Sequence, residues 1–562
     1  MVITMKKVYV NEDWCLGCHL CEFTCAAANS GAPDMIKAFA GGKKPVARIQ
    51  IEEGDKINFA VQCRHCDAHP CVKGCIAGAL SVQDGVIVCD EEKCVGCYTC
   101  VLSCPYGAIV IDEAGHKIRK CDLCTRNSHG EPACVKACPN NAIVFGKGEV
   151  TDMNYVIIGN SAAAVGTIEG IRQIDKTGKI TVISDEKYHT YSRPLISYWL
   201  MGKVTDKNIY YRSADFYEKN GVETRFDTRV TKIDPAAKNV VLADGSTVPY
   251  DKLMVATGSK PFVPPMNGME KIASCHTFMS YDSVKAIKAE VKPGMKVLII
   301  GAGLIGLKAA EALNEYKADI TVVDMADRIL PSILDVRAGS IMKKHIESKG
   351  TKFILGTSVD EFSEHSAKLK NGAAVDFDMV IIAVGVRPNT ELVSEAGGKV
   401  ERGIICDLTQ KTTIDDVYAA GDCTVSHDAS SDTDRILALL PNAYMQGEVA
   451  GRNMAGAETK YENAIPMNAI GFFGLHIITA GSYDGEEYVE EHGNNYKKLV
   501  FKDGLLKGFI LMGDVKRAGI YTSMIKERID LSDVDMDMLK ERPQMMMFSK
   551  ARREDKLGGI KR

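Results

Sequence analysis

The stretch Lys296–Leu313, KVLIIGAGLIGLKAAEAL, contains an intact G-x-G-x-x-G motif formed by Gly301, Gly303 and Gly306. The apolar run before the first glycine predicts a buried strand, and the alanine- and leucine-rich run after it predicts a helix. In a dinucleotide-binding unit the first glycine makes the turn, the second lets the backbone approach the pyrophosphate, and the third packs helix against strand. The stretch therefore predicts an α/β unit that binds a dinucleotide.

The next predicted strand, DITVVD, ends at Asp324. A carboxylate at this position favours the free 2′-hydroxyl of NAD and repels the phosphate of NADP, so we expect NAD(H). Arg328 lies nearby in the sequence and keeps NADP open as the second choice.

A related but degraded pattern occurs at Tyr155–Arg172, YVIIGNSAAAVGTIEGIR, where Gly159, Ser161 and Ala164 take the three turn positions. Alone this pattern fits an ordinary strand-to-helix turn equally well. The following strand, KITVIS, is succeeded by Asp185, whose carboxylate could accept from adenosine ribose hydroxyls. This context favours a second dinucleotide site.

Cysteine is concentrated before residue 140, where sixteen of the twenty cysteines form four groups of four. The first and third groups follow C-x2-C-x2-C-x3-C, and the third and fourth end in Cys-Pro, as in bacterial ferredoxins. We therefore predict four [4Fe–4S] clusters. The predicted ligands are Cys15, Cys18, Cys21, Cys25; Cys63, Cys66, Cys71, Cys75; Cys94, Cys97, Cys100, Cys104; and Cys121, Cys124, Cys134, Cys138.

Two other uses of these cysteines remain open but are disfavoured. Disulfides suit small secreted chains, and Met1–Val10 has no signal-peptide character. Zinc sites use paired CxxC motifs, and they leave the third and fourth cysteine of each group without a role. His65 and His69 lie among the ligands, where hydrogen bonding is favoured over ligation, and Cys89 is expected to be a small buried residue.

Composition sets further limits. A chain of 562 residues predicts several domains, and a net charge of −4 gives no reason to expect nucleic acid. The longest apolar run, Val297–Leu307, is too short to span a membrane. With no targeting segment recognised, we expect a cytoplasmic protein, in the reducing, low-oxygen setting that such clusters favour.

Residues 1–140 resemble the four-cluster ferredoxin-like subunits of molybdenum and tungsten oxidoreductases, hydrogenases and carbon monoxide dehydrogenases. The resemblance is carried by Gln62–Cys75 and Glu91–Ile109, and Asp34–Glu53 is most similar to the subunit paired with carbon monoxide dehydrogenase. It implies that groups one and four exchange their last cysteines, as do groups two and three, so that the clusters form a chain. The exchanged residues are Cys25 with Cys138, and Cys75 with Cys104.

Residues from 154 to about 560 resemble the two-dinucleotide flavoproteins, which include disulfide reductases, NADH oxidases and NADH:rubredoxin oxidoreductases. Besides the two turns, Leu253–Pro265 (LMVATGSKPFVPP) and Val417–Cys423 (VYAAGDC) carry this resemblance. It implies FAD in the first unit and NAD in the second. The further residues implied at these cofactors are Arg193, Thr257, Gly258, Gly385, Gly421 and Asp422.

No cysteine lies between Tyr155 and Cys275, where disulfide reductases of this kind carry their redox thiols. Thiol–disulfide chemistry by that route is therefore excluded. Hydride transfer between stacked rings needs no acid–base residue, and none is predicted. Lys308 stands where relatives often have glutamate, and no role is transferred to it; Cys423 is interpreted as a packing residue.

The predicted fold is an α+β polyferredoxin domain, then an α/β two-dinucleotide flavoprotein, then an α+β interface domain. A homo-oligomer through the interface domain remains open, and the basic end of this domain, Lys540–Arg562, is interpreted as a solvated tail or a docking segment. The predicted boundaries are 1–145 for the clusters, 152–280 and 381–455 for FAD, 281–380 for NAD, and 456–562 for the interface domain.

Flavin takes two electrons at once and a cluster carries one, so the combination predicts an electron-transfer oxidoreductase. The leading hypothesis is a subunit that links NAD(H) to a catalytic metalloenzyme, first of all carbon monoxide dehydrogenase. A tungsten aldehyde oxidoreductase, formate dehydrogenase or hydrogenase remains open as the partner. The alternatives are a stand-alone NADH:ferredoxin or rubredoxin reductase, and a docking module with a vestigial flavin half.

Overall fold

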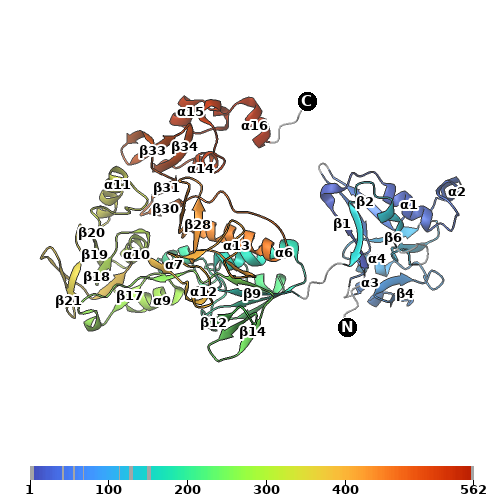
Figure 1. Ribbon diagram of the computed structural model, residues 1–562, viewed down its shortest axis with the longest axis horizontal. Coiled ribbons are helices and arrows are strands. Elements are labelled where there is room, and N and C mark those ends of the chain that lie inside the picture. The colour runs from blue at the N-terminus through green and yellow to red at the C-terminus, as the bar shows by residue number, and fades with distance from the viewer. Residues whose placement is uncertain are drawn as a thin grey trace. The chain divides into compact units, whose positions relative to one another are not determined.

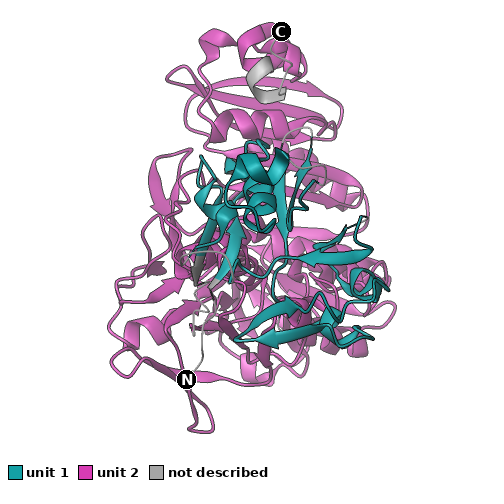
Figure 2. Cartoon of the chain, turned by 90° about the vertical axis from the view of Figure 1, so that its right-hand side faces the viewer, with its two compact units in different colours: residues 1–151 teal, residues 152–562 magenta. Residues whose placement is uncertain are grey.

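The computed structural model describes residues 6–40, 44–54, 57–66, 69–112, 114–125, 131–147 and 153–557. The chain divides into two compact units, Met1–Thr151 and Asp152–Arg562 (Figure 2). The division falls in the short joint between the cysteine-rich part and the first dinucleotide turn.

The first unit is built from short antiparallel strand pairs and short helices. The strands pair as β1 with β8, β2 with β3, β4 with β5, and β6 with β7. Its strands are β1 (Lys6–Val10), β2 (Ile49–Glu53), β3 (Asn58–Gln62), β4 (Leu80–Gln83), β5 (Val86–Cys89), β6 (Ile109–Asp112), β7 (Lys117–Lys120) and β8 (Ile143–Lys147). Its helices are α1 (Leu20–Ala28), α2 (Met35–Ala40), α3 (Pro70–Lys73), α4 (Thr99–Ser103) and α5 (Ala133–Lys136).

A fourfold repeat is visible in the backbone of the cysteine groups. The residue before the second cysteine of each group has a left-handed φ, at 64° for Gly17, 45° for His65, 70° for Gly96 and 59° for Leu123. The turn wraps the chain back, so that the amides of His65 and Leu123 donate to the thiol of the first cysteine of their own group. Local geometry thus brings successive cysteines round one centre.

The second unit begins with a five-stranded parallel sheet in the order β11-β10-β9-β15-β27. Its strands are β9 (Asn154–Ile158), β10 (Lys179–Ile183), β11 (Val222–Arg225), β15 (Lys252–Val255) and β27 (Val417–Ala419). A three-stranded antiparallel sheet follows β11, formed by β12 (Val230–Asp234), β13 (Asn239–Leu242) and β14 (Thr247–Pro249). From β9 the chain adds β10 and β11 on one side of the sheet and later β15 and β27 on the other. Open α/β sheets bind dinucleotides at the point where the direction of strand addition reverses in this way.

Two helices of this domain, α6 (Ala162–Ile174) and α13 (Leu440–Met454), lie side by side (Figure 1). Gly166 and Gly170 of α6 and Gly447 and Gly451 of α13 form their interface. A Cβ atom placed on any of the four would lie 2.0–2.3 Å from a carbonyl oxygen of the opposite helix. The close approach therefore requires glycine at all four positions, and it joins two helices that lie far apart in the chain.

The second dinucleotide domain repeats the parallel sheet, in the order β17-β24-β18-β19-β20. Its strands are β17 (Cys275–Thr277), β18 (Lys296–Ile300), β19 (Asp319–Asp324), β20 (Lys352–Leu355) and β24 (Met379–Ile382), with an antiparallel sheet of β21 (Val359–Phe362), β22 (Ser366–Leu369) and β23 (Ala374–Asp376). Its helices are α9 (Tyr281–Glu290), α10 (Leu304–Asn314) and α11 (Val336–Glu347). The sheet starts before the predicted boundary at residue 281, because the short edge strand β17 carries no alternation that reveals it.

Two antiparallel strands, β16 (Ser259–Pro261) and β25 (Val386–Pro388), connect the dinucleotide domains. The remaining α-helices and strands of these domains are short. They are α7 (Ile196–Leu200), α8 (Phe216–Lys219), α12 (Glu391–Glu395), β26 (Ile404–Ile405), β28 (Thr424–Asp428) and β29 (Thr433–Arg435).

The C-terminal domain is a five-stranded antiparallel sheet covered by helices. The sheet order is β30-β31-β34-β33-β32, with β30 (Met467–Phe472), β31 (Leu475–Gly481), β32 (Glu486–His492), β33 (Asn495–Lys502) and β34 (Leu505–Met512). The helices are α14 (Ala518–Lys526), α15 (Met536–Glu541) and α16 (Lys550–Leu557). The interpretation of Lys540–Arg562 as a solvated tail is wrong for its first part, because Met547 and Phe548 are buried in the domain core.

The fold class is confirmed: a ferredoxin-like domain precedes a two-dinucleotide α/β fold and a C-terminal α+β domain. Within the described residues, no helix has the length and apolar character needed to cross a bilayer.

Candidate functional site

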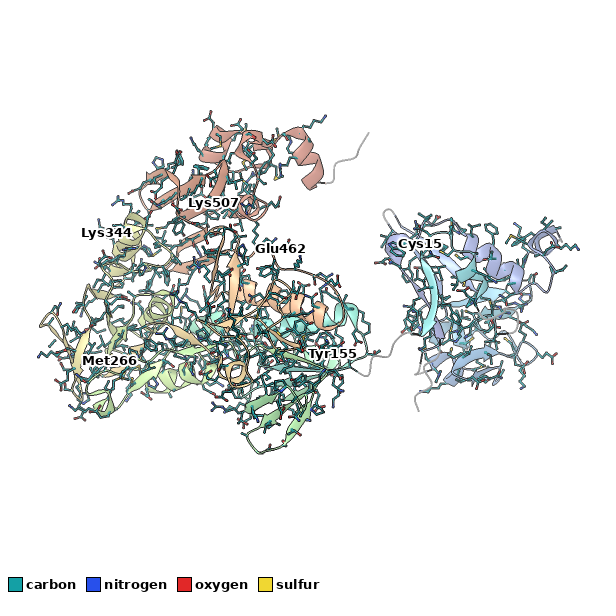
Figure 3. The ribbon with its side chains drawn as sticks, viewed as in Figure 1. Cys15, Tyr155, Met266, Lys344, Glu462 and Lys507 are labelled. Atoms are coloured by element: carbon teal, nitrogen blue, oxygen red, sulfur yellow. The ribbon has the colours of Figure 1, made fainter. Side chains whose placement is uncertain are left out.

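The first cysteine group does not form a site alone. A surface pocket is lined by Cys15, Cys18 and Cys21. Its fourth thiol is Cys138, which comes from the last cysteine group in the sequence of this unit. Figure 3 labels Cys15 in this unit. Helix α1 packs against α5, which brings the fourth group beside the first.

The third group has the same arrangement. Cys94, Cys97 and Cys100 line a second pocket together with Cys75, the last cysteine of the second group. Helix α3 packs against α4 and makes this exchange geometrically simple. The sulfur-bearing residues of both pockets are therefore drawn from two motifs each.

Eight thiols line neither pocket, and the exchange that the family resemblance implies would divide them into two inner sets. Burial raises the pKa of Cys134, and so do the neighbouring thiols Cys121, Cys25 and Cys124. We take these four residues as the first inner set.

The other inner set is centred on Cys71. Burial raises the pKa of this thiol, and Cys63, Cys66 and Cys104 are among the neighbours that act on it. The positions of Cys138 and Cys75 in the two pockets agree with the exchange that the family resemblance implies.

The four sets lie in sequence across the domain. One core cluster contains Cys21 of the first pocket, Cys134 of the first inner set and Cys63 of the second inner set. Cys71 and Cys100 share a core cluster, which links the second inner set to the second pocket. Cys18 and Cys97, one in each pocket, are exposed. The arrangement is a row with two exposed ends.

Backbone amides point at the thiols. Besides His65 and Leu123, the amide of Arg48 donates to Cys25 Sγ at 3.2 Å, and that of Ala79 donates to Cys75 Sγ at 3.2 Å. Such donors stabilise negative charge on sulfur and set cluster potentials. Among the described residues, no three His, Cys, Asp or Glu side chains converge on one point as the ligands of a single metal ion do. Thiols gathered in this way, most of them buried or half-buried and several with N–H donors, fit iron–sulfur clusters.

The first dinucleotide turn lies at the end of β9, whose Tyr155 is labelled in Figure 3. Gly159 has a φ of 109°, and a Cβ there would lie 2.1 Å from the carbonyl oxygen of Ala256. Ser161 is the N-cap residue of α6, and Ala164 is fully buried in the helix. The turn is therefore built as a dinucleotide turn despite its altered second and third positions.

Three charged residues, Arg193, Glu186 and Asp422, converge near this turn. The Arg193 guanidinium donates to Glu186 Oε1 at 2.8 Å, to the hydroxyl of Tyr191 at 3.1 Å and to the carbonyl of Met279 at 3.3 Å. Asp422 accepts from the hydroxyl of Ser259 at 3.1 Å and interacts with Arg193. Burial raises the pKa of the Asp422 carboxyl, since the charged form loses its hydration.

Glu186 was not predicted from the sequence, while its neighbour Asp185 was. Asp185 is exposed in the loop after β10 and is not part of this convergence. The signal that could have identified Glu186 is the adjacency of two acidic residues at the end of the second strand.

Two chain segments cross between the dinucleotide domains, one at Thr257 and one at Asn389, and reciprocal hydrogen bonds join them. The Thr257 hydroxyl donates to the carbonyl of Asn389, and the Asn389 amide side chain donates to the carbonyl of Thr257. Gly258 and Gly385 have left-handed φ values of 63° and 120° on these two segments. Gly421, with a φ of 86°, is fixed by a hydrogen bond from its amide to Gln446.

The second dinucleotide turn matches the full motif. Gly301 has a φ of 113°, and a Cβ there would lie 2.3 Å from the carbonyl oxygen of Ala383. A Cβ on Gly306 would lie 2.0 Å from the carbonyl oxygen of Gly301, while one on Gly303 would meet nothing within 4 Å. Gly303 thus leaves open space for a pyrophosphate, and its two companions shape the turn.

Asp324 lies at the carboxyl end of β19, beside this turn. Its two carboxylate oxygens accept from the amides of Ala302, at 2.6 Å, and Ala326, at 2.7 Å. The carboxylate is therefore fixed at the edge of the site where a ribose would bind.

Lys308 contacts the C-terminal domain. Its ammonium donates to Glu311 at 2.7 Å and to the carbonyl of Gly471 at 2.6 Å, and Glu311 accepts from the amide of Phe473. The pair joins α10 to the turn between β30 and β31 of the C-terminal domain.

Three family models match the chain. Residues 153–447 match pyridine nucleotide-disulphide oxidoreductase, residues 55–148 match a 4Fe-4S dicluster domain, and residues 466–529 match the rubredoxin NAD+ reductase C-terminal domain. The cluster model begins after the first cysteine group and spans the other three.

Among curated proteins, the chain is 31% identical over 391 residues to the NADH-dependent phenylglyoxylate dehydrogenase subunit epsilon of Aromatoleum evansii, which covers 67% of this chain and 92% of that protein. It is also 31% identical to the nitrite reductase [NAD(P)H] of Bacillus subtilis, over 67% of this chain but 48% of that protein. The crystal structure of NADH:rubredoxin oxidoreductase from Clostridium acetobutylicum is similar, with a TM-score of 0.57 and 25% identity, covering 69% of this chain and 99% of that one.

The first model spans more than half of the chain, and the Aromatoleum relative is matched over nearly its whole length. The paired dinucleotide turns and the Arg193–Asp422 convergence lie within the same residues. The chain therefore belongs to the pyridine nucleotide-disulphide oxidoreductase family.

Proposed function

We propose that this iron–sulfur flavoprotein oxidoreductase passes electrons between NAD(H) and a partner metalloenzyme through four [4Fe–4S] clusters and FAD. The observation that carries the proposal is the row of four thiol sets with an exposed cysteine, Cys18 or Cys97, at each end. A row of this kind suits electron transport from a distant donor, whereas a single surface cluster would suffice for a diffusible one.

Cluster ligation follows the four sets. The outer sites use Cys15, Cys18, Cys21 with Cys138, and Cys94, Cys97, Cys100 with Cys75. The inner sites use Cys25, Cys121, Cys124 with Cys134, and Cys63, Cys66, Cys71 with Cys104.

In the flavin half, FAD is held by the turn at Gly159, Ser161 and Ala164, by Arg193 and by Asp422. When bound, FAD supplies the exchange between a two-electron hydride and single electrons. The chain's own residues bind and orient: Arg193 supplies a positive charge fixed by Glu186, and Thr257 and Gly258 shape the crossing. NAD(H) binds at Gly301, Gly303 and Gly306, with Asp324 at the ribose and Gly385 at the second crossing.

The partner is proposed as a catalytic dehydrogenase, with carbon monoxide dehydrogenase first. The similarity of Asp34–Glu53 to the ferredoxin subunit of that enzyme supports this choice. The Aromatoleum relative is named as one subunit of an NADH-dependent dehydrogenase, which supports the coarser idea of a subunit that serves a larger enzyme.

Cluster number is tested by metal analysis of the anaerobically purified chain. We expect about sixteen iron atoms, four for each cluster, and one FAD per chain. Cys97→Ser should remove one cluster, whereas Cys89→Ser, a half-buried cysteine outside the four sets, should remove none. About eight iron atoms, with free thiols in the first group, would reduce the proposal to a two-cluster protein.

The partner is tested by reconstitution. A mixture of the chain, carbon monoxide dehydrogenase, carbon monoxide and NAD+ should form NADH, and Cys18→Ser or Cys97→Ser should stop it while NADH still reduces FAD. If NADH forms only after ferredoxin is added, carbon monoxide dehydrogenase is not a direct partner.

A stand-alone NADH:rubredoxin or ferredoxin reductase is the second candidate. It is favoured by the match of residues 466–529 to the rubredoxin NAD+ reductase C-terminal domain and by the similarity to the Clostridium structure. Fast NADH-dependent reduction of free rubredoxin, unchanged when the outer cluster cysteines are replaced, would favour this candidate.

A further inference from the structure

Lys120 is a buried cation in the cluster unit. It ends β7 directly before Cys121, and it is 3% exposed. Its ammonium donates to the carbonyls of Ile87 and Cys121, both at 2.6 Å. No ion pair joins it to a carboxylate within the described part of the chain, so its charge is left uncompensated by an acidic residue.

Two partly buried arginines of this unit contrast with Lys120. Arg48 donates to Asp122 at 2.8 Å, and Arg119 donates to Asp112 at 2.9 Å. A buried ion normally needs such a partner, because its desolvation costs several kcal/mol. Lys120 therefore needs negative charge from another source.

Two contacts place Lys120 beside both inner sets. Its ammonium donates to the carbonyl of Cys121 and to that of Ile87, and Ile87 packs in one core cluster with Cys71. Cys121 belongs to one inner set and Cys71 to the other. Lys120 thus lies at the junction of the two inner sites.

His65 brings a second donor to this junction. The amide of Ile87 donates to His65 Nδ1 at 3.0 Å, which places the ring proton on Nε2. His65 is 1% exposed, and its Nε2 has no hydrogen-bond partner. One peptide residue, Ile87, therefore orients both a buried N–H donor and a buried ammonium.

We propose that Lys120 and His65 raise the reduction potential of the two inner clusters. A buried cluster resists reduction, since each added electron increases negative charge in a medium of low dielectric. The ammonium of Lys120 and the N–H of His65 oppose this penalty. Electrons can then cross the buried middle of the row without a large unfavourable step between its exposed ends. The inference rests on the proposed cluster ligation.

The test is a redox titration of the whole chain, followed by electron paramagnetic resonance, with iron content measured on the same samples. Lys120→Gln retains hydrogen-bonding capacity and removes the charge. We expect full iron content and, at the potential that half-reduces an inner cluster of the wild type, a reduced-to-oxidised ratio about tenfold lower, equivalent to 59 mV for one electron.

Lys120→Arg should restore the wild-type ratio, and Lys37→Met, which removes an exposed lysine on α2, should leave it unchanged. His65→Leu should lower the ratio of one cluster in the same direction. Should Lys120→Gln fail to assemble clusters, the His65→Leu titration decides. Unchanged potentials in iron-replete variants overturn the inference, whereas iron stoichiometry tests the ligation separately.

Discussion

The two dinucleotide turns of this chain have the same first position and differ at the other two. Gly159 and Gly301 share a left-handed φ and the same close approach to the carbonyl of a neighbouring strand. At the second position the chain has Ser161 in one turn and Gly303 in the other. Only some glycines of the motif are therefore required by the protein's own backbone.

The largest expected effect comes from the position that the turns share. Gly159→Ala and Gly301→Ala each place a Cβ 2.1–2.3 Å from a carbonyl oxygen, at a φ that alanine rarely adopts. We expect each to lower the unfolding free energy by about 3 kcal/mol or more. Gly159→Ala should lose FAD, measured as flavin absorbance per chain.

Gly301→Ala should retain FAD and lose its reduction by NADH, which separates the two turns. Gly519→Ala, in α14, is the control, because a Cβ there meets nothing within 4 Å. Equal loss of flavin from both variants would contradict the assignment of one cofactor to each turn.

A smaller loss of unfolding free energy is expected at α6 and α13, the helix pair that packs beside the first turn only. Gly447→Ala places a Cβ 2.0 Å from the carbonyl oxygen of Ala163, so α13 must move away from α6. Such overpacking costs about 1–3 kcal/mol. Calorimetry should show a lower Tm with FAD released at that transition, and a Tm like that of Gly519→Ala would show that the helices separate without cost.

Arg193→Met tests the charge beside the first turn. Loss of a charge-assisted hydrogen bond costs about 1.5–3 kcal/mol, so FAD should bind roughly ten- to hundredfold more weakly. FAD titration of the apoprotein measures this change. Glu186→Gln, which keeps Arg193 but loosens it, should have a smaller effect; the reverse order would show that Glu186 acts on FAD directly.

The smallest effects should arise where the turns differ. Ser161→Gly should change the unfolding free energy by no more than about 0.5 kcal/mol, as expected for a site without a required side chain. Gly303→Ala should be equally silent in unfolding yet raise the KM for NADH, because its Cβ occupies the space left for the pyrophosphate. A large stability loss in Gly303→Ala would place an unseen protein contact at that position.

Much of the fold was predictable because its signals are local. Strand, turn and helix follow one another within Lys296–Leu313, and the cysteine groups are contiguous. The α6–α13 packing was not predictable, since Gly166 and Gly447 are far apart in the chain and neither carries a motif. The edge strand β17 was not predictable either, because its three residues are too few to show a periodic pattern.

The candidate site divides in the same way. The cysteine exchange was anticipated through the family resemblance, and the structure places the four thiols of each outer pocket accordingly. Lys120 and His65 were not predicted to act together, because they meet only through Ile87. That contact depends on how β5 packs beside β7.

The first and last strands of the cluster unit are neighbours. Strand β1 pairs antiparallel with β8, from Lys6 opposite Lys147 to Val10 opposite Ile143. The entry and the exit of the chain therefore lie next to each other on one edge of the unit. We expect that such a unit can be fused in front of a different reductase through one short connection. The arrangement of its cysteine sets should then be unchanged.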